Sequence, residues 1–235
     1  DLALLFSLLC LSPMLYIQAM SLWQRPHFQF FPLAWIGFGY FWSLRVGVPS
    51  DSQSRIRTTI GILAVLCSLA VAAESLIISS PWMTQVAAVG FVVAWLLLRA
   101  GHARWQTAVA LASLLVLTIP LPAGYDDKLI QLLQAKSSQA ASFILDLICI
   151  VHLPEGNVLS IAKKKLFVDE ACSGVDSLYA LMAICLTILL WFRQRFSVAL
   201  VSLALVPMWA SCSNILRLVI IAVGIDQYDI DLSHG

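Results

Sequence analysis

Long apolar runs separated by short polar connectors make up most of this chain. A helix needs about 20 apolar residues, with a range of roughly 17–25, to cross the hydrocarbon core of a bilayer. Seven runs approach or exceed that length: Leu2–Met20, Phe28–Leu44, Thr58–Ile78, Trp82–Leu98, Trp105–Leu121, Gly174–Phe192 and Phe196–Val223. Tryptophans lie near several of their ends, as in the aromatic belts of membrane interfaces. The pattern predicts an all-α integral membrane protein, a multi-pass helical bundle with about seven spans.

The stretch 122–173 departs from this pattern. Between residues 127 and 152, apolar residues recur near helical spacing, namely Leu129, Leu132, Leu133, Ala140, Phe143, Ile144 and Leu147. The first half of this predicted helix is polar, and its apolar part, Ala140–Leu153, is short for a span. We therefore predict an interfacial or re-entrant helix.

A small hairpin is expected between that helix and the sixth span. The short runs Val158–Ala162 and Leu166–Val168 are rich in β-branched and apolar residues and flank the polar turn Lys163–Lys165. The predicted organisation is a single transmembrane domain over 1–235. It has five spans in 1–121, an insert in 122–173, two spans in 174–223 and a tail in 224–235.

Composition supports the membrane interpretation. Of 235 residues, 60% are hydrophobic and 11% are charged, whereas soluble domains have about 25% charged residues. The formal net charge of +1 gives no sign of nucleic-acid binding. The six cysteines form no CxxC pair, and His27, His102 and His152 lie in separate loops, so we expect no metal site and no cofactor.

Arginine distribution predicts the orientation. If Ala140–Leu153 does not cross the bilayer, one set of connectors carries seven arginines, Arg45, Arg55, Arg57, Arg99, Arg104, Arg193 and Arg195, and the short connectors opposite carry only Arg25. The arginine-rich side is then cytoplasmic. The insert carries five lysines on the other side, but long loops translocate largely regardless of charge. The insert and the tail are thus predicted to face outward.

Cys172 is the one cysteine with polar neighbours, and it directly precedes the sixth span. Ser173-Gly174-Val175-Asp176 matches a capping box, with Ser173 as N-cap and Asp176 at N3. The free N–H groups and the positive dipole end of a helix N-terminus favour a thiolate. Glu170 and Asp176 oppose that shift, so a neighbouring cation is needed. Ser173 is itself a possible nucleophile, although its capping role is the better interpretation.

Two further polar groups accompany the last span. Arg217 lies within it, about two turns before its predicted outer end, and Asn214, three residues earlier, shares its helix face. An ionisable side chain at that depth is expensive and is by default a functional hypothesis. Arg217 can stabilise a thiolate or an oxyanion. His234, beyond the end of the span, can act as acid and base. Asn214 can support catalysis or form an interhelical hydrogen bond, and both interpretations stay open.

These residues resemble the motifs of the exosortase/archaeosortase family. Glu170-Ala171-Cys172-Ser173-Gly174 is similar to its nucleophile motif, Asn214-Ile215-Leu216-Arg217 to its Asn-x-x-Arg motif, and Ser233-His234-Gly235 to its histidine site. The resemblance covers the chain from about Pro120 onward, with the motifs in the family's order.

The resemblance implies a membrane cysteine transpeptidase or protease that takes part in protein sorting. Cys172 would be the nucleophile, Arg217 the transition-state stabiliser and His234 the acid/base. Glu170, Ser173, Gly174, Asp176 and Asn214 would have supporting roles. The implied partners are membrane lipid and secreted proteins with a C-terminal sorting tail, cut through a thioester on the extracytoplasmic face of a prokaryotic plasma (inner) membrane.

Two features differ from the family pattern. Asp176 stands where members commonly have a basic residue, and members usually have another span after the histidine. The chain starts at Asp1 rather than at a methionine, and it stops at Gly235 within a polar stretch. We therefore interpret it as a fragment or processed form without that final helix. The alternatives from other classes are a small transporter or channel in which Arg217 lines the pathway, and a purely structural assembly protein.

Overall fold

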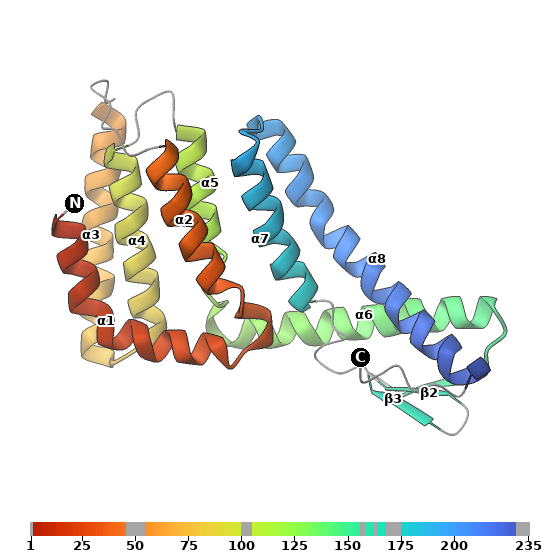
Figure 1. The fold of residues 1–235 in the computed structure, drawn as a ribbon. Helices are drawn as coiled ribbons and strands as arrows, with labels where there is room; N and C mark the ends of the chain where they lie inside the picture. The colour runs from red at the N-terminus through yellow and green to blue at the C-terminus, as the bar shows by residue number, and fades with distance from the viewer. Residues whose placement is uncertain are drawn as a thin grey trace. The chain divides into compact units, whose positions relative to one another are not determined.

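The computed structural model describes residues 2–45, 55–99, 105–155, 158–161, 164–167 and 175–228. Its helices and strands follow the order drawn in Figure 1: α1 (Leu2–Trp23), η1 (Pro26–Phe28), α2 (Phe31–Arg45), α3 (Arg55–Ile78), α4 (Pro81–Arg99), α5 (Trp105–Val116), η3 (Pro122–Gly124), α6 (Tyr125–Leu147), β1 (His152–Glu155), β2 (Val158–Ile161), β3 (Lys164–Phe167), α7 (Val175–Trp191) and α8 (Phe196–Tyr228). Each of the seven apolar runs forms a helix.

Four of the described helices, α1, α3, α4 and α8, are long and apolar enough to cross a membrane. The helix α7 is apolar but shorter, and α2 and α5 contain 15 and 12 residues. The chain is therefore a multi-pass helical membrane protein, and its total of seven spans stays a prediction.

The chain divides into two compact units. Unit 1 consists of residues 1–120 and 183–200, and unit 2 consists of residues 121–182 and 201–235. Each of α7 and α8 therefore contributes one segment to each unit.

Small residues bring the helices of unit 1 together. The helix α4 packs against both α3 and α1, and α3 buries Gly61, Ser68, Ala72 and Ser75. A Cβ placed on Gly90 of α4 would lie 2.5 Å from the Ser68 Oγ, so any larger residue here would force the Ser68 side chain to move. In lipid, close backbone approach through small residues takes the place of a hydrophobic driving force between helices.

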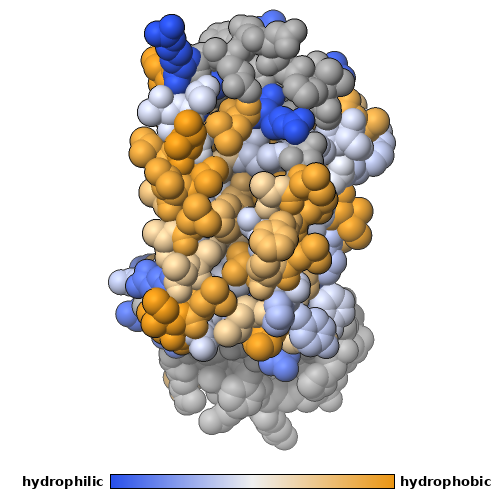
Figure 2. All heavy atoms as spheres, turned by 90° about the vertical axis from the view of Figure 1, so that its left-hand side faces the viewer, coloured by the Kyte–Doolittle hydropathy of each residue, from blue (hydrophilic) through white to orange (hydrophobic). Residues whose placement is uncertain are grey.

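Large apolar side chains of unit 1 point outward. The side formed by α1 and α3 presents a hydrophobic band between more polar ends (Figure 2). Phe6, Leu63 and Leu66 are among its exposed residues. Such a surface is unfavourable in water and suits the hydrocarbon core of a bilayer.

The helix α1 bends near its middle into two arms of different direction (Figure 1). Pro13 lies inside this helix and has no N–H to donate to the Leu9 carbonyl. The Ser12 hydroxyl donates to that carbonyl at 2.7 Å and satisfies it. The predicted span Leu2–Met20 thus forms one helix with the length and composition to cross, and that helix is bent.

A chain of buried side-chain amides connects three parts of unit 1. Gln18 of α1 donates from Nε2 to the Gln85 Oε1 of α4 at 2.9 Å. Gln85 donates from Nε2 to the backbone oxygen of Thr118 at 2.8 Å and lies 3.3 Å from its hydroxyl. Thr118 in turn donates to the Leu115 carbonyl. Because these groups are buried among apolar side chains, the network fixes how the segments pack.

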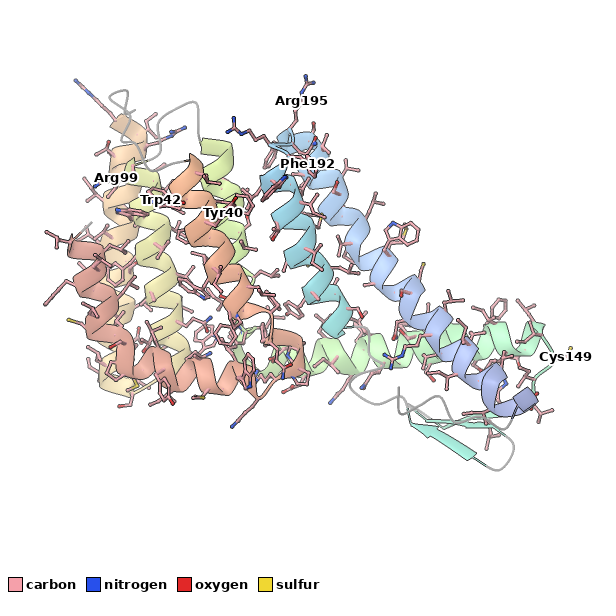
Figure 3. The ribbon with its side chains drawn as sticks, viewed as in Figure 1. Tyr40, Trp42, Arg99, Cys149, Phe192 and Arg195 are labelled. Carbon is pink, nitrogen blue, oxygen red and sulfur yellow. The ribbon has the colours of Figure 1, made fainter. Side chains whose placement is uncertain are left out.

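Aromatic and cationic side chains gather at one end of unit 1. Figure 3 shows Tyr40, Trp42, Arg99, Phe192 and Arg195 there. The ring centroids of Trp42 and Trp95 are 3.9 Å apart, and the Arg99 Cζ lies 6.0 Å from the Trp95 centroid. The rings of Tyr40 and Trp191 stack with their centroids 6.2 Å apart. This composition is typical of a membrane–water interface. It is the arginine-rich end that we predict to be cytoplasmic.

A three-stranded antiparallel sheet forms in unit 2, with strand order β1-β2-β3. His152 pairs with Ile161, and Val158 pairs with Phe167. The predicted hairpin is thus present as β2 and β3, but the prediction omitted β1. That strand contains Pro154, which is tolerated because β1 is at the edge of the sheet.

An apolar cluster joins α6 to the C-terminal half of α8. It contains Ala141, Leu145 and Ile150 from α6 and the turn after it, and Leu218, Ile221, Ala222 and Ile225 from α8. This contact is the core of unit 2.

The helix α6 buries several polar residues, and its exposed face mixes charged residues such as Asp127, Lys128 and Lys136 with large apolar ones. Its buried stripe is Asp126, Ile130, Gln134, Ser137, Ser138, Ala141 and Leu145, whereas Leu132, Phe143 and Leu147 are more than half exposed. Among the described helices, α6 is not one with the composition of a span. The helix predicted between residues 127 and 152 is therefore present, and its interfacial or re-entrant placement stays a prediction.

Candidate active site

The described residues contain part of the predicted site. Arg217 and Asn214 lie on α8, and Asp176 is the second residue of α7. Cys172, Glu170, Ser173, Gly174 and His234 lie outside the described residues. The convergence of Cys172, Arg217 and His234 therefore stays a prediction.

The helix α7 begins at Val175, three residues after Cys172. This agrees with the expected start of the sixth span at Gly174. The first turn of a helix has free N–H groups and a partial positive charge of about half a unit, which favours a thiolate near it. Cys172 therefore precedes a helix N-terminus in the sequence. Ser173 lies outside the described residues, so its capping role stays a prediction.

Asn214 occupies the buried face of α8. It precedes Leu218, Ile221 and Ile225 at helical spacing, and its side chain is 6% exposed. Among the described residues, the Asn214 Nδ2 has no hydrogen-bond acceptor. The interhelical hydrogen bond considered from the sequence is therefore absent from the described part of the chain. A buried donor without an acceptor is uncommon in native structures and requires an explanation.

Arg217 flanks the same face and is exposed. It makes an interaction within the protein, so its guanidinium is not isolated. The helix α8 continues past the predicted end of the span, Val223, to Tyr228. Arg217 consequently lies about three turns, or about 16 Å of helix rise, before the helix end rather than two.

Polar residues that the sequence analysis did not select are buried in unit 2. Asp126, Gln134, Ser137 and Ser138 lie on the inner face of α6. Asp126 is close enough to Tyr179 of α7 for a Coulombic interaction. The sequence shows that this half of the helix is polar, but spacing alone does not separate the buried polar residues from exposed ones such as Lys128 and Lys136.

His152 connects α6 to the sheet. Its Nδ1 lies 3.0 Å from the Ile150 carbonyl and its Nε2 lies 2.6 Å from the Ser142 Oγ. A carbonyl can only accept, so Nδ1 donates to it; in the neutral imidazole, Nε2 then accepts the hydrogen of the Ser142 hydroxyl. The Asp146 carboxylate lies 3.9 Å from Nε2. The structural role expected for His152 agrees with these contacts, and no metal-binding group of three or more His, Cys, Asp or Glu side chains occurs among the described residues.

These features define a class of protein: a multi-pass helical membrane protein with a cysteine before a helix N-terminus and an Asn-x-x-Arg motif in its last described helix. The chain belongs to the transmembrane exosortase family (Exosortase_EpsH), which it matches over residues 23–235. The matched range contains the positions of all three motifs and begins well before Pro120, where the resemblance seen in the sequence started. Neither a curated protein nor a solved structure was found to match the chain.

Proposed function

We propose that this protein is a cysteine transpeptidase or protease that cleaves C-terminal sorting signals of secreted proteins. One observation carries the proposal. The family match over residues 23–235 contains Cys172, Arg217 and His234 in sequence order, and Cys172 comes three residues before a helix. A general membrane role would not need a cysteine, an arginine and a histidine at these positions.

The chemistry assigned to these residues is acyl transfer. His234 accepts the proton of the Cys172 thiol, and the sulfur attacks the carbonyl carbon of the scissile peptide bond. The Arg217 guanidinium stabilises the oxyanion of the tetrahedral intermediate. When the C–N bond breaks, His234 gives its proton to the leaving amine and a thioester to Cys172 remains. Water or an amine from an acceptor then attacks the thioester and restores the thiol.

Electrostatics favour this assignment. The N-terminus of α7 and a nearby arginine both stabilise a thiolate, whereas Glu170 and Asp176 oppose it. Arg217 therefore has two tasks in the proposal, first with the thiolate and then with the oxyanion. The low dielectric constant of the membrane environment strengthens each of these interactions.

The proposed partners follow from this chemistry and from the family. Substrates are secreted proteins whose tail contains a short motif, a membrane helix and a basic cluster. Cleavage is proposed to occur on the extracytoplasmic face of a prokaryotic plasma membrane. The arginine-rich end of unit 1, with Arg99 and Arg195, would then face the cytoplasm.

Substitution of the nucleophile tests the proposal. Cys172→Ser and Cys172→Ala should leave a co-expressed secreted protein with such a tail uncleaved, as followed by the change in its mass. Cys149→Ser is the matched control, because Cys149 is exposed at the turn after α6 (Figure 3) and has no assigned role. Normal processing by both Cys172 variants would refute the proposal.

A further inference from the structure

Buried carboxamides occur in both units, and they differ in their partners. Gln18 and Gln85 in unit 1 bond to each other, and Gln85 also bonds to Thr118. Asn214 in unit 2 is equally buried, yet its Nδ2 has no acceptor among the described residues. An unsatisfied buried donor destabilises a protein, so a position that keeps one is expected to bind an acceptor from outside the chain.

The surroundings of Asn214 indicate the kind of acceptor. The inner stripe of α6 changes from Gln134 and Ser138 to apolar Ala141 and Leu145, and that of α8 changes from Asn214 to apolar Leu218. Figure 1 shows α6 and the C-terminal half of α8 running toward the same end of unit 2, where their apolar parts pack. The buried stripe of α6 is thus polar on the side away from this contact. In the buried stripe of α8, Asn214 is a single polar residue between apolar Ala210 and Leu218, so its donor faces a neutral environment.

We propose that the Asn214 Nδ2–H binds a carbonyl oxygen of the substrate's main chain next to the bond that Cys172 attacks. A neutral carboxamide donor matches a neutral amide carbonyl, whereas Arg217, one turn further along α8, suits the negative oxyanion. Asn214 is then a substrate-binding residue. This inference rests on the proposed function, because it places the substrate carbonyl beside Asn214 and Arg217.

Stability measurements test whether Asn214 has a partner inside the protein. Asn214→Leu keeps the side-chain size and removes the donor, so the melting temperature in dodecyl maltoside should stay the same or rise. Gln85→Leu is the matched control and should lower the melting temperature, because it breaks satisfied bonds. If Asn214→Leu lowers the melting temperature as much as Gln85→Leu does, the inference is overturned. The inference is also overturned if Asn214→Leu lowers the melting temperature only in phospholipid nanodiscs, because a lipid ester carbonyl would then be the acceptor.

Reactivity of Cys172 tests carbonyl recognition with two small probes. Iodoacetamide has a carbonyl and forms an S–CH₂ bond as iodide leaves. Bis(2-hydroxyethyl) disulfide has no carbonyl and forms a mixed disulfide as 2-mercaptoethanol leaves. Asn214→Leu should lower the ratio of the iodoacetamide rate to the disulfide rate at Cys172 about fivefold, which is the value of one ordinary hydrogen bond. The same ratio at exposed Cys149 should not change.

The two proposals fail in different ways. If Cys172 in the unchanged protein reacts with the disulfide no faster than Cys149 does, the proposed nucleophile is wrong. If Cys172 is the faster cysteine but its ratio of the two rates is the same in the unchanged protein and in the Asn214→Leu variant, only the carbonyl-binding role of Asn214 is wrong.

Discussion

Gln85 gives the most direct test of how unit 1 is held together. Gln85→Leu removes the bonds to Gln18 and to Thr118, and it leaves the Gln18 amide and the Thr118 carbonyl without these partners. Interhelical hydrogen bonds in membrane proteins average about 0.6 kcal/mol each. Three such bonds give about 2 kcal/mol, and the orphaned groups raise the cost to about 2–4 kcal/mol. The free energy of unfolding should fall by that amount.

Thermal unfolding of the purified protein measures this loss. For a protein of this size, about 2–4 kcal/mol corresponds to a decrease of roughly 5–12 °C in melting temperature. Gln18→Leu should cost less, because it breaks one bond. The double variant should cost less than the two losses added together, because Gln85→Leu has already removed the partner of Gln18. Strictly additive losses, or a Gln85→Leu protein as stable as the parent, would refute the network argument.

Three further outcomes are expected. Ser142→Ala should lower stability by about 1–3 kcal/mol, because it leaves the buried His152 Nε2 without its donor, and hydrogen exchange at β1 should report the loosening. Gly90→Leu should prevent the close approach of α3 and α4 at Ser68, seen as a lower melting temperature, whereas Gly39→Leu, at a position with open space, should not. Arg217→Lys keeps the positive charge but loses the planar set of N–H donors of the guanidinium. The cleavage rate should fall about 100-fold or more while expression is unchanged. Activity close to that of the parent would exclude the oxyanion role.

The helices could be predicted from the sequence because span length and hydrophobicity are local properties. Each apolar run became a helix, since backbone groups in lipid must be satisfied within the segment. The helix α8 is longer than the predicted span because it continues past the apolar run, through Asp226 to Tyr228. The strand β1 was missed because a four-residue segment containing Pro154 gives almost no pattern.

The orientation of α6 and the state of Asn214 depend on tertiary structure. The apolar residues Leu132 and Phe143 predicted a helix correctly, but not that this side would face outward. The Asn-x-x-Arg spacing put Asn214 and Arg217 on one helix side, but no spacing could reveal that the Asn214 amide has no acceptor in the described part of the chain. Whether Cys172 and His234 meet Arg217 stays a prediction, tested by the variants above.

The polar residues that α6 buries bear on how the chain is assembled in the cell. While its partners are still being synthesised, this helix would expose Gln134, Ser137 and Ser138 to whatever lies beside it, and hydrocarbon is a poor environment for them. It is best kept at the lipid headgroups until α7 and α8 have left the insertion machinery. We therefore expect docking of α6 to follow the synthesis of α7 and α8, and a chain cut short before α8 to leave these polar residues without the partner that buries them.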